Sequence, residues 1–392
     1  MRILHCYPHA CFGGGASNDF RSLTISLLKY YSTIEVHVVF PTPPNVSITQ
    51  RQHSWELPFQ VTGASSTYWP EAKQYDQLSD HELEEYFNGA YRSLLKLVDM
   101  IKPDLIHGHL LLPGGWAAAR IGEEYGIPTI ITSHGADVKV TEADDRYLKR
   151  SIHYFRNVKY LIGYSPDHKE WIQSLLPKSF KNKVTYIPGG IDTDSFLSHV
   201  DSTSIEKKYG LPHKGFVLAV GRFQKRKGFH LLLEAAQKIH FPIVLIGGGW
   251  EAIALREQAV RQGLTNVRIL DFLGPRQSAV LKKFYSAAGV VVIPSLTREE
   301  TLCFVGLEAM ASGTPVIASN VGGLKFILDE GRTGVLIQPG DVNILANTIN
   351  EVMHDPDLRM NLVKAARLYV EKQFRWERVA QEYFNLYKKV LR

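Results

Sequence analysis

Two glutamates eight residues apart, Glu300 and Glu308, stand in a stretch whose residue types suit ligand binding. An apolar run from Val290 to Ser295 predicts a buried strand before them, and a helical segment carrying Glu308 ends near Gly313. We expect Glu300 at the mouth of this helix and Glu308 about two turns inside it. A carboxylate beside open helix N–H groups suits a polyhydroxylated, anionic ligand. The alternative is an ordinary strand–loop–helix unit with solvated glutamates.

Two cations follow a second predicted strand, Phe216–Gly221. Arg222 and Lys227 lie where this strand ends and a helix is about to begin. Arginine offers bidentate contacts and lysine a point charge, so the pair can neutralise a diphosphate. The stretch QKRK also has the composition of a simple basic turn.

Histidines end two further predicted strands. His134 ends the apolar run TIITSH and precedes Asp137, so it lies on the carboxyl edge of the expected sheet, where either a site role or a structural role fits. His107 and His109 end the preceding strand, and their spacing could suit a metal. No third ligand is apparent from the sequence, so we expect core or edge roles for this pair.

Other motifs bear on metal and hydrolytic chemistry. Asp192-Thr193-Asp194 has an Asp-x-Asp form that can hold a metal against a nucleotide diphosphate, but its position favours a turn and helix cap. We therefore predict no metal site and no resident cofactor. The sequence contains no phosphate-binding loop ending in Gly-Lys-Ser/Thr and no Gly-x-Ser-x-Gly elbow, which argues against ATP hydrolysis and serine hydrolase chemistry.

Length and composition limit the class of protein. The chain has 392 residues, 45% hydrophobic and 21% charged, which predicts a globular protein of two domains. There is no N-terminal signal pattern and no apolar run of roughly 18 residues. Cys6, Cys11 and Cys303 have unrelated spacings, so we expect no disulfide framework and a reduced, cytoplasmic protein.

The net charge of +6 lies entirely in the C-terminal half. Residues 1–190 contain 19 Lys/Arg and 19 Asp/Glu, whereas residues 191–392 contain 26 and 20. A basic C-terminal half fits an anionic ligand such as a nucleotide diphosphate. No basic stripe interleaved with aromatics predicts nucleic-acid binding, and the neutral N-terminal half argues against docking of that half on anionic lipid.

The alternation of apolar runs and helical stretches predicts an α/β protein with two Rossmann-like, doubly wound parallel-sheet domains facing across a cleft. We expect an N-terminal domain over residues 1–195, a C-terminal domain over 196–375, and a helix over 376–392 that crosses back to the N-terminal domain. The predicted strands are Arg2–Tyr7, Glu35–Phe40, Leu105–His109, Thr129–His134, Tyr160–Ser165, Phe216–Gly221, Ile243–Gly248, Val267–Leu273, Val290–Ser295 and Pro315–Ser319.

Two loops of the N-terminal domain are candidates for ligand contact. The glycines at 13–15 follow the first strand and let the backbone approach a ligand. They are not a dinucleotide fingerprint, because Asn18 stands where its last glycine would be. The segment 41–85 is rich in aromatics and then acidic. It is either a binding loop or a hydrophobic flap followed by a solvated acidic helix.

Taken in order, several motifs resemble the family-4 retaining glycosyltransferases of the GT-B fold (the glycogen synthase-like, group 1 glycosyltransferases). The motifs are the GGG loop at 13–15, HGAD at 134–137, PGGID at 188–192, GRFQKRKG at 221–228, IGGGW at 246–250, and E-x7-E at 300–308 running into EAMASGTPVIAS. The resemblance implies an enzyme that binds a nucleotide-sugar and transfers the sugar with retention at the anomeric carbon, usually without metal.

The same resemblance implies roles for individual residues. Arg222 and Lys227 would hold the diphosphate and stabilise the leaving nucleotide, Glu308 would bind the ribose, and Glu300 would contact the donor sugar. His134 would touch the sugar and the developing charge. The further implied donor contacts are Gly14, Gly15, Arg276, Thr301, Leu302, Cys303 and Phe304. For the acceptor, we expect contacts from His109 and Asp137 of the N-terminal domain.

Two positions depart from the family pattern. Leu302-Cys303 stand where Phe-Gly is frequent, which bears on which sugar fits, and PGGID replaces the commoner Pro-Asn-Gly-Ile-Asp. We predict transfer of a hexose or N-acetylhexosamine from UDP-GlcNAc or UDP-glucose to a small polar acceptor such as an aminocyclitol. The alternatives are a membrane-surface transferase acting on a lipid-linked or polysaccharide acceptor, and a sugar-nucleotide epimerase or hydrolase.

Overall fold

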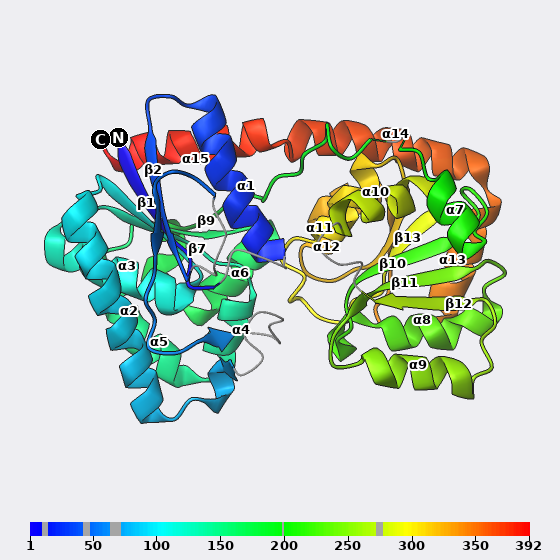
Figure 1. The fold of residues 1–392 in the computed structure, drawn as a ribbon, viewed down its shortest axis with the longest axis horizontal. Coiled ribbons are helices and arrows are strands. Elements are labelled where there is room, and N and C mark those ends of the chain that lie inside the picture. The colour runs from blue at the N-terminus through cyan, green and yellow to red at the C-terminus, as the bar shows by residue number, and fades with distance from the viewer. Residues whose placement is uncertain (10–14, 42–47, 63–71, 198–199, 272–276) are drawn as a thin grey trace. The chain divides into compact units, whose positions relative to one another are not determined.

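Two sheets of parallel strands form the framework of the protein (Figure 1). The computed structural model describes residues 1–9, 15–41, 48–62, 72–197, 200–271 and 277–392. Within them, the first sheet has the order β3-β2-β1-β6-β7-β8-β9 and the second the order β12-β11-β10-β13-β14-β15; β4 and β5 form a separate pair. The strands are β1 Arg2–Cys6, β2 Glu35–Phe40, β3 Gln52–Ser54, β4 Val61–Thr62, β5 Lys73–Gln74, β6 Leu105–His109, β7 Thr129–Thr132, β8 Tyr160–Gly163, β9 Val184–Tyr186, β10 Val217–Arg222, β11 Ile243–Gly248, β12 Val267–Asp271, β13 Val290–Ile293, β14 Val316–Ser319 and β15 Val335–Ile337.

Helices connect these strands and cover the sheets. The α-helices are α1 Gly15–Tyr30, α2 Asp80–Ile101, α3 Trp116–Tyr125, α4 Ala136–Ala143, α5 Asp145–Phe155, α6 Pro166–Leu175, α7 Thr203–Tyr209, α8 Phe229–Ala235, α9 Ala252–Arg261, α10 Gln277–Ala287, α11 Phe304–Ala311, α12 Leu324–Ile327, α13 Val342–His354, α14 Pro356–Gln373 and α15 Trp376–Val390. Short turns of other helix types are η1 Tyr75–Gln77, η2 Leu111–Gly115, η3 Lys178–Lys183, η4 Lys225–Lys227, η5 Ala236–Lys238 and η6 Asp329–Gly331.

The chain divides into two compact units. Unit 1 comprises Met1–Gly190 together with Trp376–Arg392, and unit 2 comprises Ile191–Arg375. From the sequence we expected the N-terminal domain to end at residue 195 and the returning helix to begin at residue 376. Helix α15 therefore belongs to unit 1, where it packs beside α1 (Figure 1).

Unit 1 buries apolar side chains on both faces of its sheet. On one face, Leu4 and Ile106 lie in a cluster with residues of α2 and α3. On the other face, Ile3 and Leu105 lie in a cluster with Phe20 of α1 and with residues of α15. Alternate residues of a strand point to opposite faces, so near-continuous apolar runs are required in a sheet covered on both sides.

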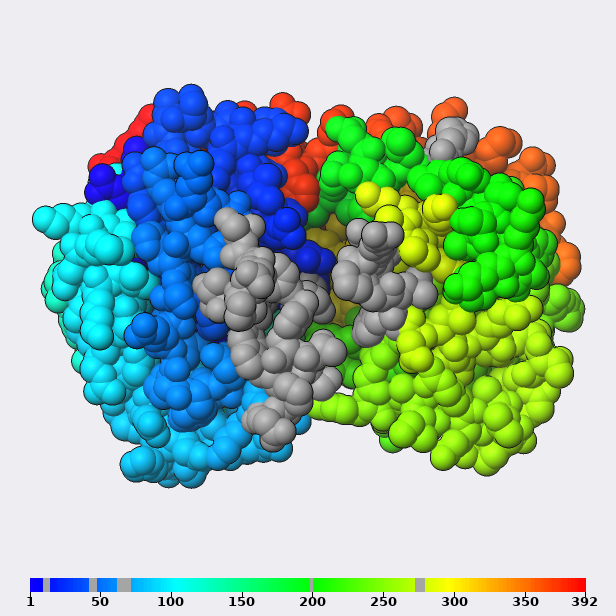
Figure 2. Space-filling model, in the orientation of Figure 1, coloured from blue at the N-terminus to red at the C-terminus, as the bar shows by residue number. Residues whose placement is uncertain are grey.

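Unit 2 follows the same plan. Val217 and Leu245 pack on one side with α8 and α13. Helix α11 contacts both α10 and α14 elsewhere in the unit. Helix α9 lies on the outer surface of this unit, and Ile253 and Val260 on it are 70% and 80% exposed (Figure 2). Helix α9 therefore packs on the core of the unit chiefly through the buried Leu255 and leaves Ile253 and Val260 exposed.

The strand order of each sheet reverses direction beside its first strand. In unit 1 the switch falls between β1 and β6, and in unit 2 between β10 and β13. Ligands of doubly wound folds bind outside the carboxyl ends of the strands at such a point, because the connecting loops diverge there. The loops that follow these four strands are therefore the expected ligand-binding segments.

The structure confirms the expected α/β class with two Rossmann-like parallel sheets. Each of the ten predicted strands is present, with ends that differ by about two residues or fewer. The prediction missed the three-residue edge strands β3, β9 and β15 and the two-residue strands β4 and β5. Segments of this length show no usable hydrophobic period, and pairing at the sheet edge decides their conformation.

Candidate active site

The switch point of unit 2 brings together the loops that carry Arg222, Lys227 and Glu300. Strand β10 ends at Arg222, its neighbour β13 ends at Ile293, and the two pair in parallel through Val217 and Val290. Their following loops therefore leave the same edge of the sheet side by side. Residues separated by more than seventy positions are placed in one site by strand order alone.

A glycine locks the first loop against the second. Gly228 has φ of +70°, and a side-chain Cβ at this position would lie 1.9 Å from the carbonyl oxygen of Pro294. The N–H of Leu296 donates to the carbonyl of Arg226 at 2.8 Å. Only glycine satisfies both the backbone angle and this close approach, so the turn 225–228 is held rigidly on the loop after β13.

Glu300 is a buried carboxylate with three partners on one oxygen. Its side chain is almost wholly inaccessible, and its Oε1 accepts from Ser295 Oγ at 3.1 Å and pairs with Lys227 Nζ and with Arg226 at 3.4 Å. Burial acts to raise the pKa of Glu300, but the charges of Lys227 and Arg226 outweigh it and hold the pKa below its usual value. Glu300 is thus an ionised carboxylate in a desolvated position.

Glu300 does not stand at the mouth of the helix, as the sequence suggested. Helix α11 begins at Phe304, so Glu300 lies in the preceding loop and Glu308 lies little more than one turn inside the helix. The loop is fixed from behind, since Gly323 N–H donates to the Glu300 carbonyl at 2.6 Å. The prediction placed the helix start too early because Thr301 to Cys303 carry no recognisable cap.

The start of α11 offers backbone donors. Cys303 occupies the N-cap position without a side-chain cap bond, and its carbonyl accepts from Gly306 and Leu307. Within the described residues, the N–H groups of Leu302, Cys303 and Phe304 donate to no other group. These are the donors that a helix N-terminus presents to an anion.

Glu308 is held by a tyrosine that the sequence analysis did not single out. Tyr285 of α10 donates its hydroxyl to Glu308 Oε2 at 2.7 Å, and Tyr285 itself is fully buried. Burial raises the pKa of Glu308 to about 7, while the bond from Tyr285 and the charge of Lys282 lower it. A carboxyl group of this kind titrates near neutral pH, unlike Glu300.

Most of the remaining donor-contact candidates lie within the described residues, and two lie outside them. Arg222 is half-buried at the end of β10. Thr301, Leu302 and Cys303 are each less than one-tenth exposed, and burial raises the pKa of the Cys303 thiol to about 12. Gly15 is the first residue of α1; Gly14 and Arg276 lie outside the described residues.

In unit 1, His134 lies in a chain of hydrogen bonds. Its Nε2 is 3.2 Å from His109 Nδ1, and its Nδ1 is 2.8 Å from the Tyr164 hydroxyl, which donates to Asp19 Oδ2 at 2.6 Å. Burial lowers the pKa of His134 to about 3, and it lowers the pKa of His109 as well. Both imidazoles are therefore neutral at physiological pH, and the structure brings these two candidates into contact.

Asp137 supports the turn that carries His134. Its carboxylate accepts from the N–H of Leu111 at 2.6 Å, from the Ser133 hydroxyl at 3.0 Å and from the N–H of His134 at 3.1 Å. Gly135, with φ of +97°, lets the chain turn between them. A buried carboxylate engaged in three hydrogen bonds positions the backbone, and the acceptor contact expected of Asp137 stays a prediction.

The two halves of the chain match two family models. Residues 13–195 match the model described as Glycosyltransferase Family 4, and residues 201–369 match the model described as Glycosyl transferases group 1. The chain belongs to this glycosyltransferase family. It carries the family's two matched regions in order, one in each structural unit.

Individual relatives cover most of this glycosyltransferase. D-inositol 3-phosphate glycosyltransferase of Corynebacterium jeikeium is 27% identical over 81% of the chain and 80% of the relative. Sucrose-phosphate synthase of Thermosynechococcus elongatus superposes with a TM-score of 0.79 at 25% identity, over 99% and 98% of the two chains. HepE of Anabaena, solved with UDP and glucose, shares the fold with a TM-score of 0.76 at 18% identity, over 99% and 100%.

A third histidine joins the pair at 107 and 109 in this glycosyltransferase. His5 on β1 pairs in register with His107 on β6, and the ligand atoms of His5, His107 and His109 lie within 4.8 Å of one another. The rings of His107 and His109 are stacked at 28°, so their nitrogen lone pairs do not converge. Both nitrogens of His107 are bonded, to Tyr387 and to Thr132. The arrangement fits a hydrogen-bonded core network better than a metal site.

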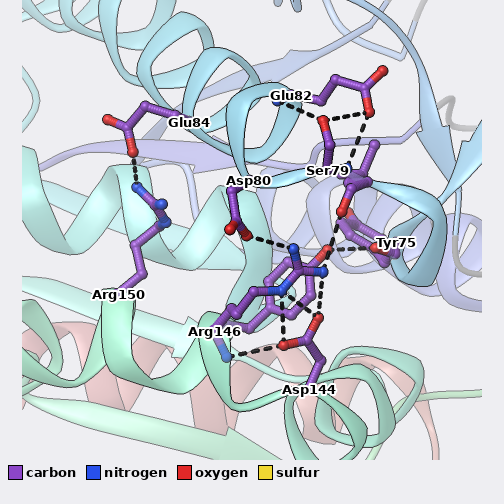
Figure 3. A network of polar contacts seen from close by, with 10 residues as sticks. Tyr75, Ser79, Asp80, Glu82, Glu84, Asp144, Arg146 and Arg150 are labelled. Carbon is purple, nitrogen blue, oxygen red and sulfur yellow. Dashed lines mark hydrogen bonds and ion pairs between the residues drawn. The ribbon is translucent and has the colours of Figure 1, made fainter.

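Two acidic residues of α2, Asp80 and Glu84, pair with arginines (Figure 3). Arg146 contacts Asp80 at 2.6 Å and Asp144 at 2.7 Å, and Arg150 pairs with Glu84. This pairing reduces the negative charge available to a cationic acceptor such as an aminocyclitol. The described part of the segment favours the hydrophobic flap, because Trp55 is buried and donates to the Ala90 carbonyl at 3.1 Å.

The Asp192-Thr193-Asp194 motif has a structural role. Asp192 Oδ1 accepts from the N–H groups of Asp194 at 3.2 Å and Ser195 at 3.1 Å, which makes a turn, and no helix begins there. The described helices include none that is long and apolar enough to cross a lipid bilayer.

Proposed function

We propose that this glycosyltransferase transfers a hexose or N-acetylhexosamine from UDP-GlcNAc or UDP-glucose to a hydroxyl of a small polar acceptor, with retention at the anomeric carbon. The observation that carries the proposal is the ionised, desolvated Glu300 carboxylate beside Lys227 and the open N–H groups at the start of α11. A carboxylate binds sugar hydroxyls, and the cation and the N–H groups bind phosphate.

In this proposal the donor's anomeric C–O bond to the diphosphate breaks, and the acceptor oxygen bonds to the same face of that carbon. The acceptor proton leaves with the UDP product or passes to solvent. Arg222 and Lys227 stabilise the charge that develops on the diphosphate, so no metal or resident cofactor is required. Glu300 orients the sugar, Glu308 binds the ribose, and His134 contacts the sugar as a neutral hydrogen-bonding group.

A polyhydroxylated cyclitol or its phosphate is our choice of acceptor. Relatives that cover about four-fifths of the chain carry the name D-inositol 3-phosphate glycosyltransferase. The pairing of Asp80, Asp144 and Glu84 with arginines makes a cationic aminocyclitol a poorer choice than the sequence suggested.

A mass-spectrometric assay tests this proposal. The purified protein is incubated with UDP-GlcNAc, UDP-glucose, GDP-mannose and ADP-glucose against inositol, inositol phosphate and an aminocyclitol, and NMR of the product reports the anomeric configuration. We expect a glycosylated cyclitol from a UDP-sugar with retained configuration. Glu300→Gln should abolish the product, and Glu234→Gln, an exposed glutamate of the same unit, should not.

Four outcomes would contradict the proposal. An inverted product would exclude retention, and turnover only with GDP or ADP donors would exclude the UDP-sugar. Conversion of the UDP-sugar without acceptor, to an epimer or to free sugar, would instead indicate an epimerase or hydrolase. Turnover only on lipid-linked acceptors in vesicles would exclude the small acceptor.

A further inference from the structure

In the sequence, Arg226 lies between Arg222 and Lys227, the two cations expected to bind the diphosphate. In the structure it contacts Glu300, the glutamate expected to bind the sugar. The Arg226 side chain is 25% exposed and spans three acceptors. The Nε of Arg226 donates to Gln224 Oε1 at 3.1 Å and pairs with Glu299 Oε2 at 3.2 Å, and NH1 reaches Glu300 Oε1 at 3.4 Å. Three acceptors on different residues therefore hold the guanidinium in place.

The partners of Glu300 are distributed unevenly between its two oxygens. Ser295, Arg226 and Lys227 all contact Oε1. Each hydrogen bond and ion-pair distance described for the Glu300 side chain is to Oε1, which leaves Oε2 as the oxygen for a ligand hydroxyl in the proposed function. The carboxylate is thus anchored through one oxygen.

Lys227 has two alternative anionic partners, Glu300 and the donor diphosphate. In the described structure its ammonium group pairs with Glu300, yet the proposed function assigns it to the donor diphosphate. A diphosphate carries more negative charge than one carboxylate, and lysine is a point charge on a flexible stem, so the ammonium group turns readily toward the stronger anion. When it does, Glu300 loses its closest partner while it remains buried.

We propose that Arg226 is a positioning residue that holds Oε1 of Glu300, together with Ser295, while Lys227 engages the diphosphate. Glu300 then stays ionised and keeps Oε2 directed at the donor sugar. A lysine at 226 would supply charge but could not span Glu299 and Glu300 with a planar fork. This inference rests on the proposed function, because it needs both a sugar on Glu300 and a diphosphate on Lys227.

The test separates sugar orientation from nucleotide binding. Arg226→Ala, Arg226→Lys and the control Lys225→Ala, an exposed residue of the same turn, are compared by donor kcat and KM, by calorimetric binding of UDP alone, and by thermal unfolding. We expect Arg226→Ala to lower kcat about tenfold or more, with UDP affinity changed by less than about twofold. Arg226→Lys should recover part of kcat, and Lys225→Ala should match wild type.

A second variant, Glu299→Gln, tests whether Arg226 affects kcat through Glu299 and not through Glu300. Glu299→Gln removes one carboxylate from Arg226 but leaves its contact with Glu300. We expect its kcat to fall less than that of Arg226→Ala; an equal fall would place the effect on Glu299 and overturn the inference.

Other results would also overturn it. Equal kinetics for Arg226→Ala and Lys225→Ala would show that Arg226 positions nothing, and a parallel loss of UDP affinity would make Arg226 a phosphate ligand. If Arg226→Ala unfolds, Arg226→Lys gives the decision, since a folded lysine variant with unchanged kcat contradicts a role for the planar fork. Failure of the proposed function is distinct, because the wild-type protein itself would then show no transfer from a UDP-sugar.

Discussion

In unit 1 the histidines at the switch point are uncharged and are held by hydrogen bonds, whereas in unit 2 the Glu300 carboxylate is held by two cations. Burial lowers the pKa of His107, His109 and His134, so the network that runs from His134 through Tyr164 to Asp19 contains uncharged imidazoles. In unit 2 the pKa of Glu300 is lowered instead, by two cations that overcome its burial. The two sheets share the same strand order around their switch points, yet they carry two different kinds of polar site.

The difference follows from what each unit is expected to bind. An ionic site exchanges partners with a charged ligand, because Lys227 can leave Glu300 for a diphosphate. A neutral network exchanges nothing and fixes geometry, since each buried donor needs its acceptor. Unit 2 should therefore respond to mutation chiefly in catalysis, and unit 1 chiefly in stability.

The largest effect should come from the ionic side of this comparison. Lys227→Ala removes the cation that supports the leaving diphosphate and that pairs with Glu300. We expect kcat/KM for the UDP-sugar to fall about 10²- to 10³-fold, the range for loss of one preorganised charge-stabilising group. Steady-state kinetics beside Lys225→Ala measure this; a fall of less than about threefold would remove Lys227 from the site.

A tyrosine tests the neutral side. The hydroxyl of Tyr387 contacts His5 at 3.0 Å and His107 at 2.8 Å from α15. Tyr387→Phe leaves buried nitrogens without this partner and should lower the free energy of unfolding by about 1–3 kcal/mol. Urea unfolding checks it, with Tyr125→Phe, an exposed tyrosine of α3, as the control. Unchanged stability would show that the network does not secure α15.

Tyr285 is an uncharged hydrogen-bond donor in unit 2, so it tests how much a neutral contact contributes in the unit whose site depends on charges. Tyr285→Phe removes the hydroxyl that orients Glu308. We expect the KM for the UDP-sugar to rise about threefold to tenfold with little change in kcat, because a single hydrogen bond to a ribose-binding group is disturbed. A change confined to kcat would argue against Glu308 as the ribose contact.

The smallest effect should be a dependence on pH. Burial raises the pKa of Glu308 to about 7 from 4.5, so the group is protonated below pH 7 and ionised above it. Ribose hydroxyls donate best to the ionised form, so affinity for UDP should increase as pH rises from about 6 to 8. Calorimetry of wild type and Glu308→Gln checks this: the dependence should vanish in the variant.

The same carboxyl affects folding with the opposite sign. Its pKa is higher in the folded state than in the unfolded chain, so its contribution to stability is fully present below about pH 4.5 and is lost as pH rises through 7. Thermal unfolding of wild type and Glu308→Gln across this interval should converge at low pH and diverge at high pH. Parallel curves would show that Glu308 is not buried as described.

Residue type and period determined a large part of the molecule by themselves. Apolar runs such as Ile243–Gly248 form strands because a strand buried on both faces tolerates little else. The motif positions of Arg222, Lys227, Glu300 and Glu308 follow from local sequence, and the family models match the same regions. These features are local, so the printed sequence is sufficient to predict them.

Other features depend on strand order, which no local pattern contains. Arg226 contacts Glu300, and Tyr285 contacts Glu308, only because β10 lies beside β13 and α10 beside α11. The third histidine, His5, meets His107 through the register of β1 with β6. Partners far apart in the chain become neighbours when the sheet forms, and their burial then sets which groups are charged. The sequence determined which residues could do chemistry, and the tertiary structure decided which of them hold the others in place.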